Sequence, residues 1–168
     1  MASGIRLRSE RLDIRPPTEE DRTRFVELFT NPEFMVFAGV CDHAQAIQRF
    51  DQMLGDCALV PFTKRPVVER ATGEVLGYAG VAPFELGGDL RLEFGYRLVT
   101  SARGKGYATE AGLALLQSAR ESWTGRLLGM IDPTNAPSIN VMTKLGFEFW
   151  KQAPVHGDAT NLYELEIP

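Results

Sequence analysis

Residues 90 to 111 contain the feature that most constrains the fold: a strand that runs through a glycine-rich turn into a helix. Side chains in the strand alternate, so one face packs on a core and the other faces water or a site. The apolar face has Leu90, Leu92, Phe94, Tyr96 and Leu98, and the other has Arg91, Glu93, Gly95 and Arg97. Small and apolar residues then recur at helical spacing from Ala108 to Trp123. They predict a helix over residues 106–123 that lies close against a sheet.

The turn between strand and helix reads Arg103-Gly104-Lys105-Gly106-Tyr107-Ala108. Glycines at such a junction let the backbone approach a ligand, and the free N–H groups of a helix start favour an anion. The turn therefore predicts a pyrophosphate site, with an ordinary glycine-rich turn as the alternative. A P-loop is excluded because Gly106, and not Ser or Thr, follows Lys105. A dinucleotide-binding fingerprint is excluded because Thr109 stands where its third glycine belongs.

The whole chain reads as strands and helices in the order β-α-α-β-β-β-α-β-α-β-β, which predicts an α/β fold with a mixed sheet and helices on its faces. Strands are expected at residues 5–15, 65–69, 75–84, 90–98, 126–132, 147–152 and 161–167. Helices are expected after Thr18, from Asp42 or His43, over 106–123 and over 136–145. Gly77 and Gly80 lie inside a predicted strand and indicate a bulge or close backbone packing.

Length and composition narrow the function classes. The 168 residues predict one domain, residues 1–168. The net charge of −4 and the pI near 5.3 argue against nucleic acid as a partner and are compatible with an amine-bearing one. Cys41 and Cys57 lack the spacing of a disulfide scaffold or a metal site, so no metal is expected. Neither a membrane-spanning stretch nor a signal peptide is evident, so a cytoplasmic protein without membrane contact is expected.

Three separated segments together resemble one family. They are Glu93–Leu98, Arg103–Ala111 and Asp132–Phe147. The second contains Arg-x-x-Gly-x-Ala, which is similar to the acetyl-coenzyme A signature of the GNAT superfamily of N-acetyltransferases. Asn-x-x-Ser and Lys-Leu-Gly-Phe in the third, with Leu-x-Ser-Glu-Arg-Leu-x-Ile-Arg-Pro at Leu7–Pro16, resemble the ribosomal-protein-alanine and -serine (RimJ/RimL-like) subgroup. The resemblance covers nearly all of the chain outside residues 34–66.

The resemblance implies the acyl-CoA N-acyltransferase fold, with a mostly antiparallel twisted sheet of six to seven strands flanked by about four helices. It also implies acetyl-CoA as co-substrate. Backbone N–H groups of Gly104 to Ala108 would hold the pyrophosphate, and backbone groups of Leu98 and Thr100 would pair with the pantetheine arm. Asn135 would form a hydrogen bond near the pantetheine or the thioester, and it would also cap its helix. The implied cofactor-binding residues are Leu98, Thr100, Arg103, Gly104, Lys105, Gly106, Tyr107, Ala108, Asn135 and Ser138. Arg103 and Lys105 either meet phosphate charge or are simply solvated, and Tyr107 is a packing or cofactor residue.

The implied reaction is the attack of a neutral amine on a thioester. An amine with a pKa of about 10 is protonated at neutral pH, so the reaction needs a base. Glu93 is the candidate, because it lies on the polar face of the strand just before the turn. The alternative is a surface charge paired with Arg91 or Arg97.

The usual acid of the family is missing from this sequence. Many members have a tyrosine in the helix before Leu-Gly-Phe, and here that position is Met142. Ser138 or Asn140 could instead hydrogen-bond the sulfur, with solvent supplying the proton. The missing tyrosine keeps a second function class open, a catalytically inactive coenzyme A-binding regulatory module.

The acceptor site is expected from residues 31–65 and from a loop at residues 152–160, and neither segment carries a readable motif. Four aromatic residues in or near these segments are expected in the core rather than in a pocket: Phe34, Phe37, Phe62 and Trp150. The subgroup resemblance favours a protein or peptide N-terminal α-amine as acceptor. A free amino acid, a polyamine or an aminoglycoside stays open, as does the choice between a monomer and a homodimer.

Overall fold

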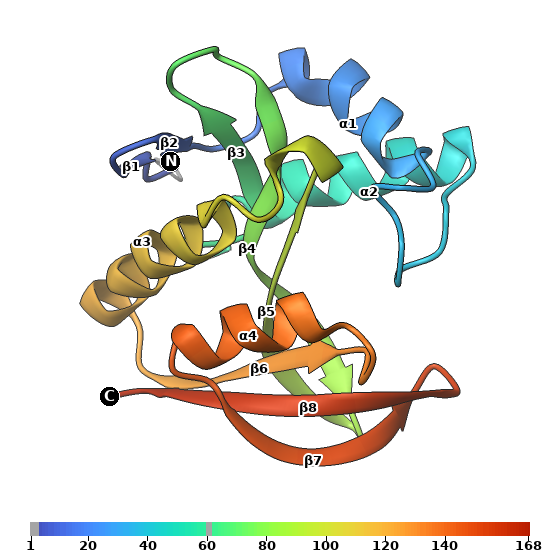
Figure 1. Ribbon diagram of the computed structural model, residues 1–168, viewed down its shortest axis with the longest axis vertical. Coiled ribbons are helices and arrows are strands. Elements are labelled where there is room, and N and C mark those ends of the chain that lie inside the picture. The colour runs from blue at the N-terminus through green and yellow to red at the C-terminus, as the bar shows by residue number, and fades with distance from the viewer. Residues whose placement is uncertain (1–3, 60–61) are drawn as a thin grey trace.

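The computed structural model describes residues 4–59 and 62–168 (Figure 1). Within these residues, eight strands form one sheet in the order β1-β2-β3-β4-β5-β6-β8-β7. The strands are β1 Leu7–Arg8, β2 Leu12–Ile14, β3 Arg65–Glu69, β4 Val75–Leu86, β5 Asp89–Leu98, β6 Gly125–Ile131, β7 Glu148–Val155 and β8 Asp158–Ile167. The α helices are α1 Arg22–Phe29, α2 His43–Asp56, α3 Tyr107–Ser122 and α4 Ala136–Lys144, and short 3-10 turns occupy Glu19–Asp21 and Thr100–Ala102. The expected mixed α/β fold class is confirmed.

Strands β5 and β6 are parallel neighbours, whereas the other strand pairs described are antiparallel. Their register pairs Leu92–Phe94 with Leu127–Gly129. Both strands continue past this short stretch, β5 to Leu98 and β6 to Ile131. The sheet is therefore open between the two strand ends, just where β5 leads to the glycine-rich turn and β6 leads to α4.

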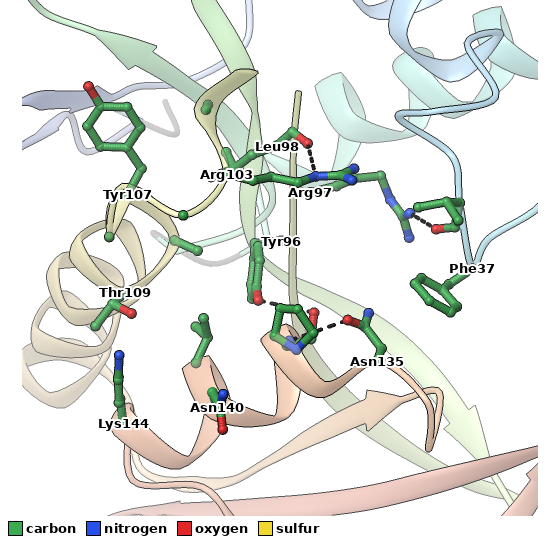
Figure 2. A pocket seen from close by; sticks show the side chains of 18 of the residues that line it. Phe37, Tyr96, Arg97, Leu98, Arg103, Tyr107, Thr109, Asn135, Asn140 and Lys144 are labelled. Carbon is green, nitrogen blue, oxygen red and sulfur yellow. Dashed lines mark hydrogen bonds between the residues drawn. The ribbon is translucent and has the colours of Figure 1, made fainter. Parts of the chain in front are cut away.

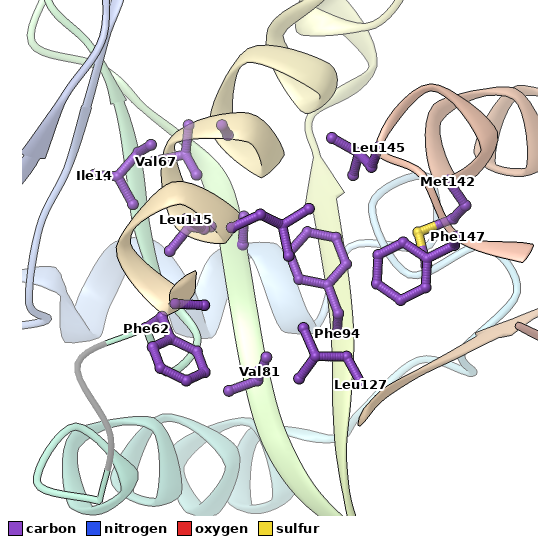
Figure 3. Close-up of a cluster of buried hydrophobic side chains, with 14 of the residues drawn as sticks. Ile14, Phe62, Val67, Val81, Phe94, Leu115, Leu127, Met142, Leu145 and Phe147 are labelled. Atoms are coloured by element: carbon purple, nitrogen blue, oxygen red, sulfur yellow. The ribbon is translucent and has the colours of Figure 1, made fainter. Parts of the chain in front are cut away.

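Helices cover both faces of the sheet, with a hydrophobic cluster under each pair. Helices α3 and α4 pack on the strands through a cluster that includes Phe94, Leu115, Leu127, Met142 and Phe147 (Figure 3). Helices α1 and α2 pack on the opposite face, where Phe25, Phe29 and Phe50 meet Tyr78 of β4. Helix α2 begins as expected, because Asp42 caps it by accepting from Gln45 N at 2.8 Å.

The sheet has eight strands where six to seven were expected, because the strand predicted at residues 5–15 is broken into β1 and β2. Ser9 N donates to Leu12 O at 3.0 Å and closes a turn between them. Glu110 of α3 holds the same turn by accepting from Ser9 Oγ and Arg11 N. The turn thus depends on a residue far along the chain, which the local alternation pattern could not indicate.

The second departure concerns residues 152–160, which form a hairpin where a loop was expected. Strand β7 ends at Val155 and β8 begins at Asp158. His156 and Gly157 connect them with positive φ angles of 50° and 87°. Two-residue turns with positive φ match the twist of the flanking strands, so the hairpin closes tightly.

The alternation in β5 fails at Leu90, which is 76% exposed. The paired part of β5 and β6 starts at Leu92. Leu90 lies beyond it, in the projecting end of the β4–β5 hairpin, opposite Glu85. An apolar side chain on a hairpin end has no helix to pack against.

Close backbone packing at Gly77 and Gly80 is confirmed, and it has a consequence for the site. A Cβ at Gly80 would lie 2.5 Å from the carbonyl oxygen of Thr63, so only glycine permits this approach. The chain before β3 runs beside β4 here, with Lys64 N donating to Val81 O at 2.9 Å. This contact carries Lys64 toward β5.

Candidate active site

A cavity of ≈ 660 Å³ lies between the start of α3 and α4 (Figure 2). Its walls are the end of β5, the glycine-rich turn, the first turn of α3, and α4. The predicted site residues that line it are Leu98, Arg103, Gly104, Gly106, Tyr107, Ala108, Asn135, Ser138 and Asn140. Thr100 and Lys105 are exposed residues of the same segment that lie outside this lining. The cavity therefore joins the second and third segments of the family resemblance.

The glycine-rich turn has the geometry of an anion site. Gly104 and Gly106 have φ angles of +72° and +80°, which favour glycine. Gly106 is the N-cap of α3, and within the described residues no side chain accepts a capping hydrogen bond from the first N–H groups of the helix. A Cβ at Gly104 would meet nothing within 4 Å, so the turn is open. Free N–H groups at the positive end of a helix suit a phosphate, and the turn therefore fits the pyrophosphate of coenzyme A.

The N-terminal strands hold this turn in place through three residues that we call the N-terminal clamp: Ser9, Arg11 and Glu110. Glu110 accepts from Ser9 Oγ at 2.6 Å, Arg11 N at 2.8 Å and Arg11 Nε at 2.7 Å. Arg11 Nη1 donates to Lys105 O at 2.9 Å, and the guanidinium lies 4.4 Å from the centre of the Tyr107 ring. Burial alone would raise the pKa of Glu110, but the contacts with Ser9 and Arg11 hold it below its usual value. Sequence analysis used both motifs for the resemblance and missed that they touch.

Two side chains of the predicted cofactor-binding residues form hydrogen bonds within the protein itself. The Tyr107 hydroxyl points away from the cavity (Figure 2) and donates to Glu69 at 2.6 Å. Arg103 donates to Leu98 O at 3.3 Å and to Glu33 O at 3.1 Å. The Tyr107 hydroxyl is thus bonded within the protein while the residue still lines the cavity, and Arg103 braces the turn against β5.

At the start of α4, Asn135 caps the helix as expected, accepting from Ser138 N at 3.3 Å. Tyr96 of β5 donates its hydroxyl to Ser138 Oγ at 3.1 Å across the opening of the sheet (Figure 2). Burial raises the pKa of Tyr96, and the effects of Ser138 and Arg103 oppose it only partly. Sequence analysis placed Tyr96 on the core face and missed this contact. The sequence held one signal for this contact: Tyr96 is the only residue on the apolar face of this strand whose side chain has a proton to donate.

Met142 occupies the helix position where many family members have a tyrosine, and its side chain is only 2% exposed. It packs with Phe147 over Gly129, where a Cβ would lie 2.4 Å from the methionine methyl group. Position 142 therefore supplies packing. The hydroxyl groups at the opening of the sheet come from Tyr96 and Ser138 instead.

A second cavity, of ≈ 1040 Å³, borders the other side of β5 and contains Glu93. Glu93 Oε2 accepts from Lys64 Nζ at 2.9 Å. The expected pairing with Arg91 or Arg97 is wrong, because Arg91 donates to Glu164 at 2.8 Å and Arg97 donates to backbone carbonyls. Burial disfavours the charge on Lys64, yet the nearby carboxylate of Glu93 holds its pKa above the usual value.

Gly95 makes room for this ion pair. It lies two residues from Glu93 on the same face of β5, and a Cβ there would be 2.9 Å from Glu93 Oε1. The same Cβ would be 3.5 Å from Lys64 Nζ. The glycine therefore lets both charged groups lie flat against the strand.

Both segments expected to build an acceptor site reach this second cavity: residues 37–39, Arg49 and Lys64 from the first, and residues 155, 156 and 158–160 from the second. Val60 and Pro61, within the first, lie outside the described residues. Phe34 and Phe62 are buried as expected. Phe37 and Trp150 are 54% and 42% exposed, so their predicted core positions are wrong. Phe37 lines both cavities, and Trp150 lies on the edge strand β7, beside Arg91 and Lys151.

Two features are absent from residues 4–59 and 62–168. No three side chains of the His, Cys, Asp or Glu type come together as a metal site would need. No helix combines the length and apolar character needed to cross a membrane.

Comparison with known proteins agrees with this geometry. The model of the acetyltransferase (GNAT) domain family matches residues 11–148. The uncharacterized protein YkkB of Bacillus subtilis is 31% identical over 160 residues, which cover 90% of this chain and 90% of YkkB. The L-methionine sulfoximine/L-methionine sulfone acetyltransferase of Pseudomonas aeruginosa is 36% identical over 94 residues, 54% of each chain.

The solved structure of a ribosomal-protein-alanine acetyltransferase from Vibrio fischeri has the same fold, with a TM-score of 0.79 at 17% identity and 97% coverage of both chains. The expected likeness to ribosomal-protein acetyltransferases is thus confirmed for the fold. A sheet that opens beside a glycine-rich helix start is compatible with a coenzyme A-dependent acyltransferase. The chain belongs to the GNAT acetyltransferase family and is an acetyl-CoA-dependent N-acetyltransferase.

Proposed function

We propose that this enzyme transfers the acetyl group of acetyl-CoA directly to a primary amine that enters through the second cavity. The observation that supports this most is that the two cavities meet at the Tyr96–Ser138 contact, since both residues line both cavities. Acetyl-CoA supplies an activated acetyl group when bound. The chain would hold the two reactants from opposite sides of one point, which favours direct transfer.

The first cavity would hold the co-substrate. In this proposal the N–H groups of Gly104 to Ala108 bind the pyrophosphate. Backbone groups of Leu98 and Thr100 would lie along the pantetheine arm. They are available because the described pairing of β5 with β6 ends at Phe94, so the edge of β5 that faces β6 has no strand partner after that residue. Asn135, at the mouth of α4, would bond near the thioester while it caps the helix.

Glu93 and Tyr96 would handle the two protons of the reaction. Glu93 accepts the proton that the attacking amine loses, either directly or through water. Tyr96 gives its hydroxyl proton to the sulfur as the carbon–sulfur bond breaks and the carbon–nitrogen bond forms. For this step the Tyr96–Ser138 hydrogen bond would reverse, with the Ser138 hydroxyl donating to the tyrosine oxygen, so that Ser138 orients Tyr96 and leaves its proton free for the sulfur. Asn140 stays a further candidate for a bond to the sulfur. A general acid held near its target typically accelerates a reaction by about 10²–10⁴-fold.

The alternative, an inactive coenzyme A-binding module, rested on the methionine at position 142. A proton donor at the junction of the two cavities favours the active enzyme over this alternative. Turnover distinguishes them. Release of free thiol and formation of an N-acetyl product should be followed with a panel of amino acids, amino-acid amides, peptides, polyamines and aminoglycosides.

The same assay tests the role of Glu93. We expect Glu93→Gln to lower kcat by about 10²-fold or more, because the amide accepts no proton. Glu85→Gln, on the neighbouring strand β4 and exposed, is the matched control and should keep wild-type activity. Stabilisation by acetyl-CoA without turnover on any amine would overturn the proposal in favour of the binding module.

A further inference from the structure

Three cationic side chains lie around Tyr78 in one part of the second cavity. Tyr78, Lys64, Arg97 and Arg49 all line it, with Glu93 as the carboxylate among them. Lys64 pairs with Glu93. Arg97 donates to Phe34 O at 3.2 Å and to Val36 O at 2.6 Å. It forms no ion pair with a carboxylate of residues 4–59 or 62–168.

Arg49 is the most available of these cations. It projects from α2, lies 5.3 Å from the centre of the Phe29 ring, and contacts Cys41 Sγ at 3.8 Å. It forms no ion pair with any of the residues that the structure describes. The other acidic side chains at the cavity are Asp132 and Asp158, which lie at the end of β6 and the start of β8 rather than on α2.

Tyr78 lies among these cations. Burial would raise the pKa of its hydroxyl, but the charges of Lys64, Arg97 and Arg49 outweigh burial and hold the pKa below its usual value. Cationic side chains that lie together inside a cavity can attract an anion.

The Glu93–Lys64 pair shows where that anion would lie relative to the amine. The two charges are 2.9 Å apart, and both line the cavity. An α-amino acid carries an ammonium and a carboxylate on one carbon atom, so its two charges are close together, like those of Glu93 and Lys64. Each of its charges can therefore face the opposite charge of the pair. It can therefore exchange partners with the pair, the ammonium facing Glu93 and the carboxylate facing Lys64 and Arg49.

We propose that the acetyl acceptor is a free α-amino acid, with its carboxylate bound between Lys64 and Arg49 and its amine beside Glu93. This inference rests on the proposed acetyl transfer and adds the substrate class. It separates this site from one for a protein N-terminus, because the first residue of a peptide has a neutral amide in place of the carboxylate. The Pseudomonas relative is named for two amino-acid analogues, which agrees with the inference.

The test is a matched acceptor series on the full chain with saturating acetyl-CoA. The series has the twenty protein amino acids as free acids, the corresponding amides, short peptides, and the decarboxylated amines. We expect kcat/KM for the best free acid to exceed that of its amide and its decarboxylated amine by about ten- to a hundredfold, as for loss of one charged hydrogen bond. The lower amine pKa of amides favours their reaction, so it works against the expected order.

Variants add a second measurement. Arg49→Gln should raise KM for the free acid by about tenfold or more, and it should shrink the ratio of kcat/KM between the free acid and its amide. Arg120→Gln, an exposed arginine on α3, is the matched control and should change none of these. The side chain of Arg49 is exposed, so the variant should fold.

Equal or faster turnover of amides, peptides or decarboxylated amines would overturn the amino-acid acceptor and leave the acetyltransferase proposal intact. An unchanged KM for the free acid in Arg49→Gln would likewise overturn it. Absence of turnover on every member of the series would instead overturn the proposed function itself.

Discussion

Removing the charge of Glu110 should both destabilise the fold and weaken binding of acetyl-CoA. The side chain is 17% exposed and accepts three hydrogen bonds from Ser9 and Arg11. Glu110→Gln keeps one oxygen, which can still accept from Ser9 Oγ and Arg11 N. Its new amide group would face Arg11 Nε, a donor against a donor.

The size of the effect follows from these contacts. A hydrogen bond to a charged group contributes about 1.5–3 kcal/mol, and the 41% exposure of the Arg11 side chain reduces the ionic part. We expect a loss of about 2 kcal/mol in the free energy of unfolding. For a chain of this size each kcal/mol corresponds to about 2–4 °C in Tm. The expected fall is therefore about 4–8 °C, measured by thermal denaturation at neutral pH.

The pH dependence of the free energy of unfolding provides an independent check that the ionised form of Glu110 stabilises the fold. The folded-state pKa of Glu110 lies below its unfolded value of about 4.3. The clamp thus contributes its full stability above about pH 4.3 and loses it as the pH falls through the folded pKa. The difference in unfolding free energy between wild type and Glu110→Gln should shrink over that acid range.

Binding should change as well, because Arg11 would no longer hold Lys105 O and the glycine-rich turn would loosen. KM for acetyl-CoA should rise more than kcat falls. Glu121→Gln, exposed on the same helix, serves as the control for charge alone. A wild-type Tm for Glu110→Gln, or a difference that persists unchanged at acid pH, would refute the clamp.

Three further predictions concern the site and its scaffold. Tyr96→Phe should lower kcat by about 10²-fold with little change in KM, and a variant with the wild-type kcat would exclude Tyr96 as the acid. In the wild type, kcat should fall only at alkaline pH, because the pKa of Tyr96 is raised and its proton stays bound through neutrality. Gly80→Ala should lower the free energy of unfolding by about 3 kcal/mol or more, since its Cβ would meet the Thr63 backbone at 2.5 Å, and an unchanged denaturation midpoint would contradict this. Gly106→Val should raise KM for acetyl-CoA about tenfold at a φ of +80°, whereas unchanged saturation kinetics would show that the turn does not carry the pyrophosphate.

The N-terminal clamp gives a physical reason why two distant motifs occur together in this sequence. Ser9 and Arg11 belong to the N-terminal run, and Lys105 and Glu110 belong to the glycine-rich turn and the helix that follows. The N-terminal strands thus act as a support for the turn. Each motif alone reads as local structure, and only their contact shows that they form one unit.

The sequence by itself determined the parts whose physics is local. Alternating side chains identify β5, helical spacing identifies α3, and paired glycines mark a turn with positive φ, because each depends on neighbours within a few residues. The order of these elements was enough for the fold class and the first cavity. The strong motifs also lie in these local segments, which is why the family resemblance appeared in them.

Only the tertiary structure decided which side chains meet. Glu93 has Lys64 as its partner because the chain before β3 runs against Gly80, and the local pattern offered Arg91 or Arg97 instead. Tyr96 reaches Ser138 because β5 and β6 are paired only over a short stretch in their described register. The register and order of the strands bring together residues that are far apart along the chain. The periodicity within one segment carries no information about such long-range contacts.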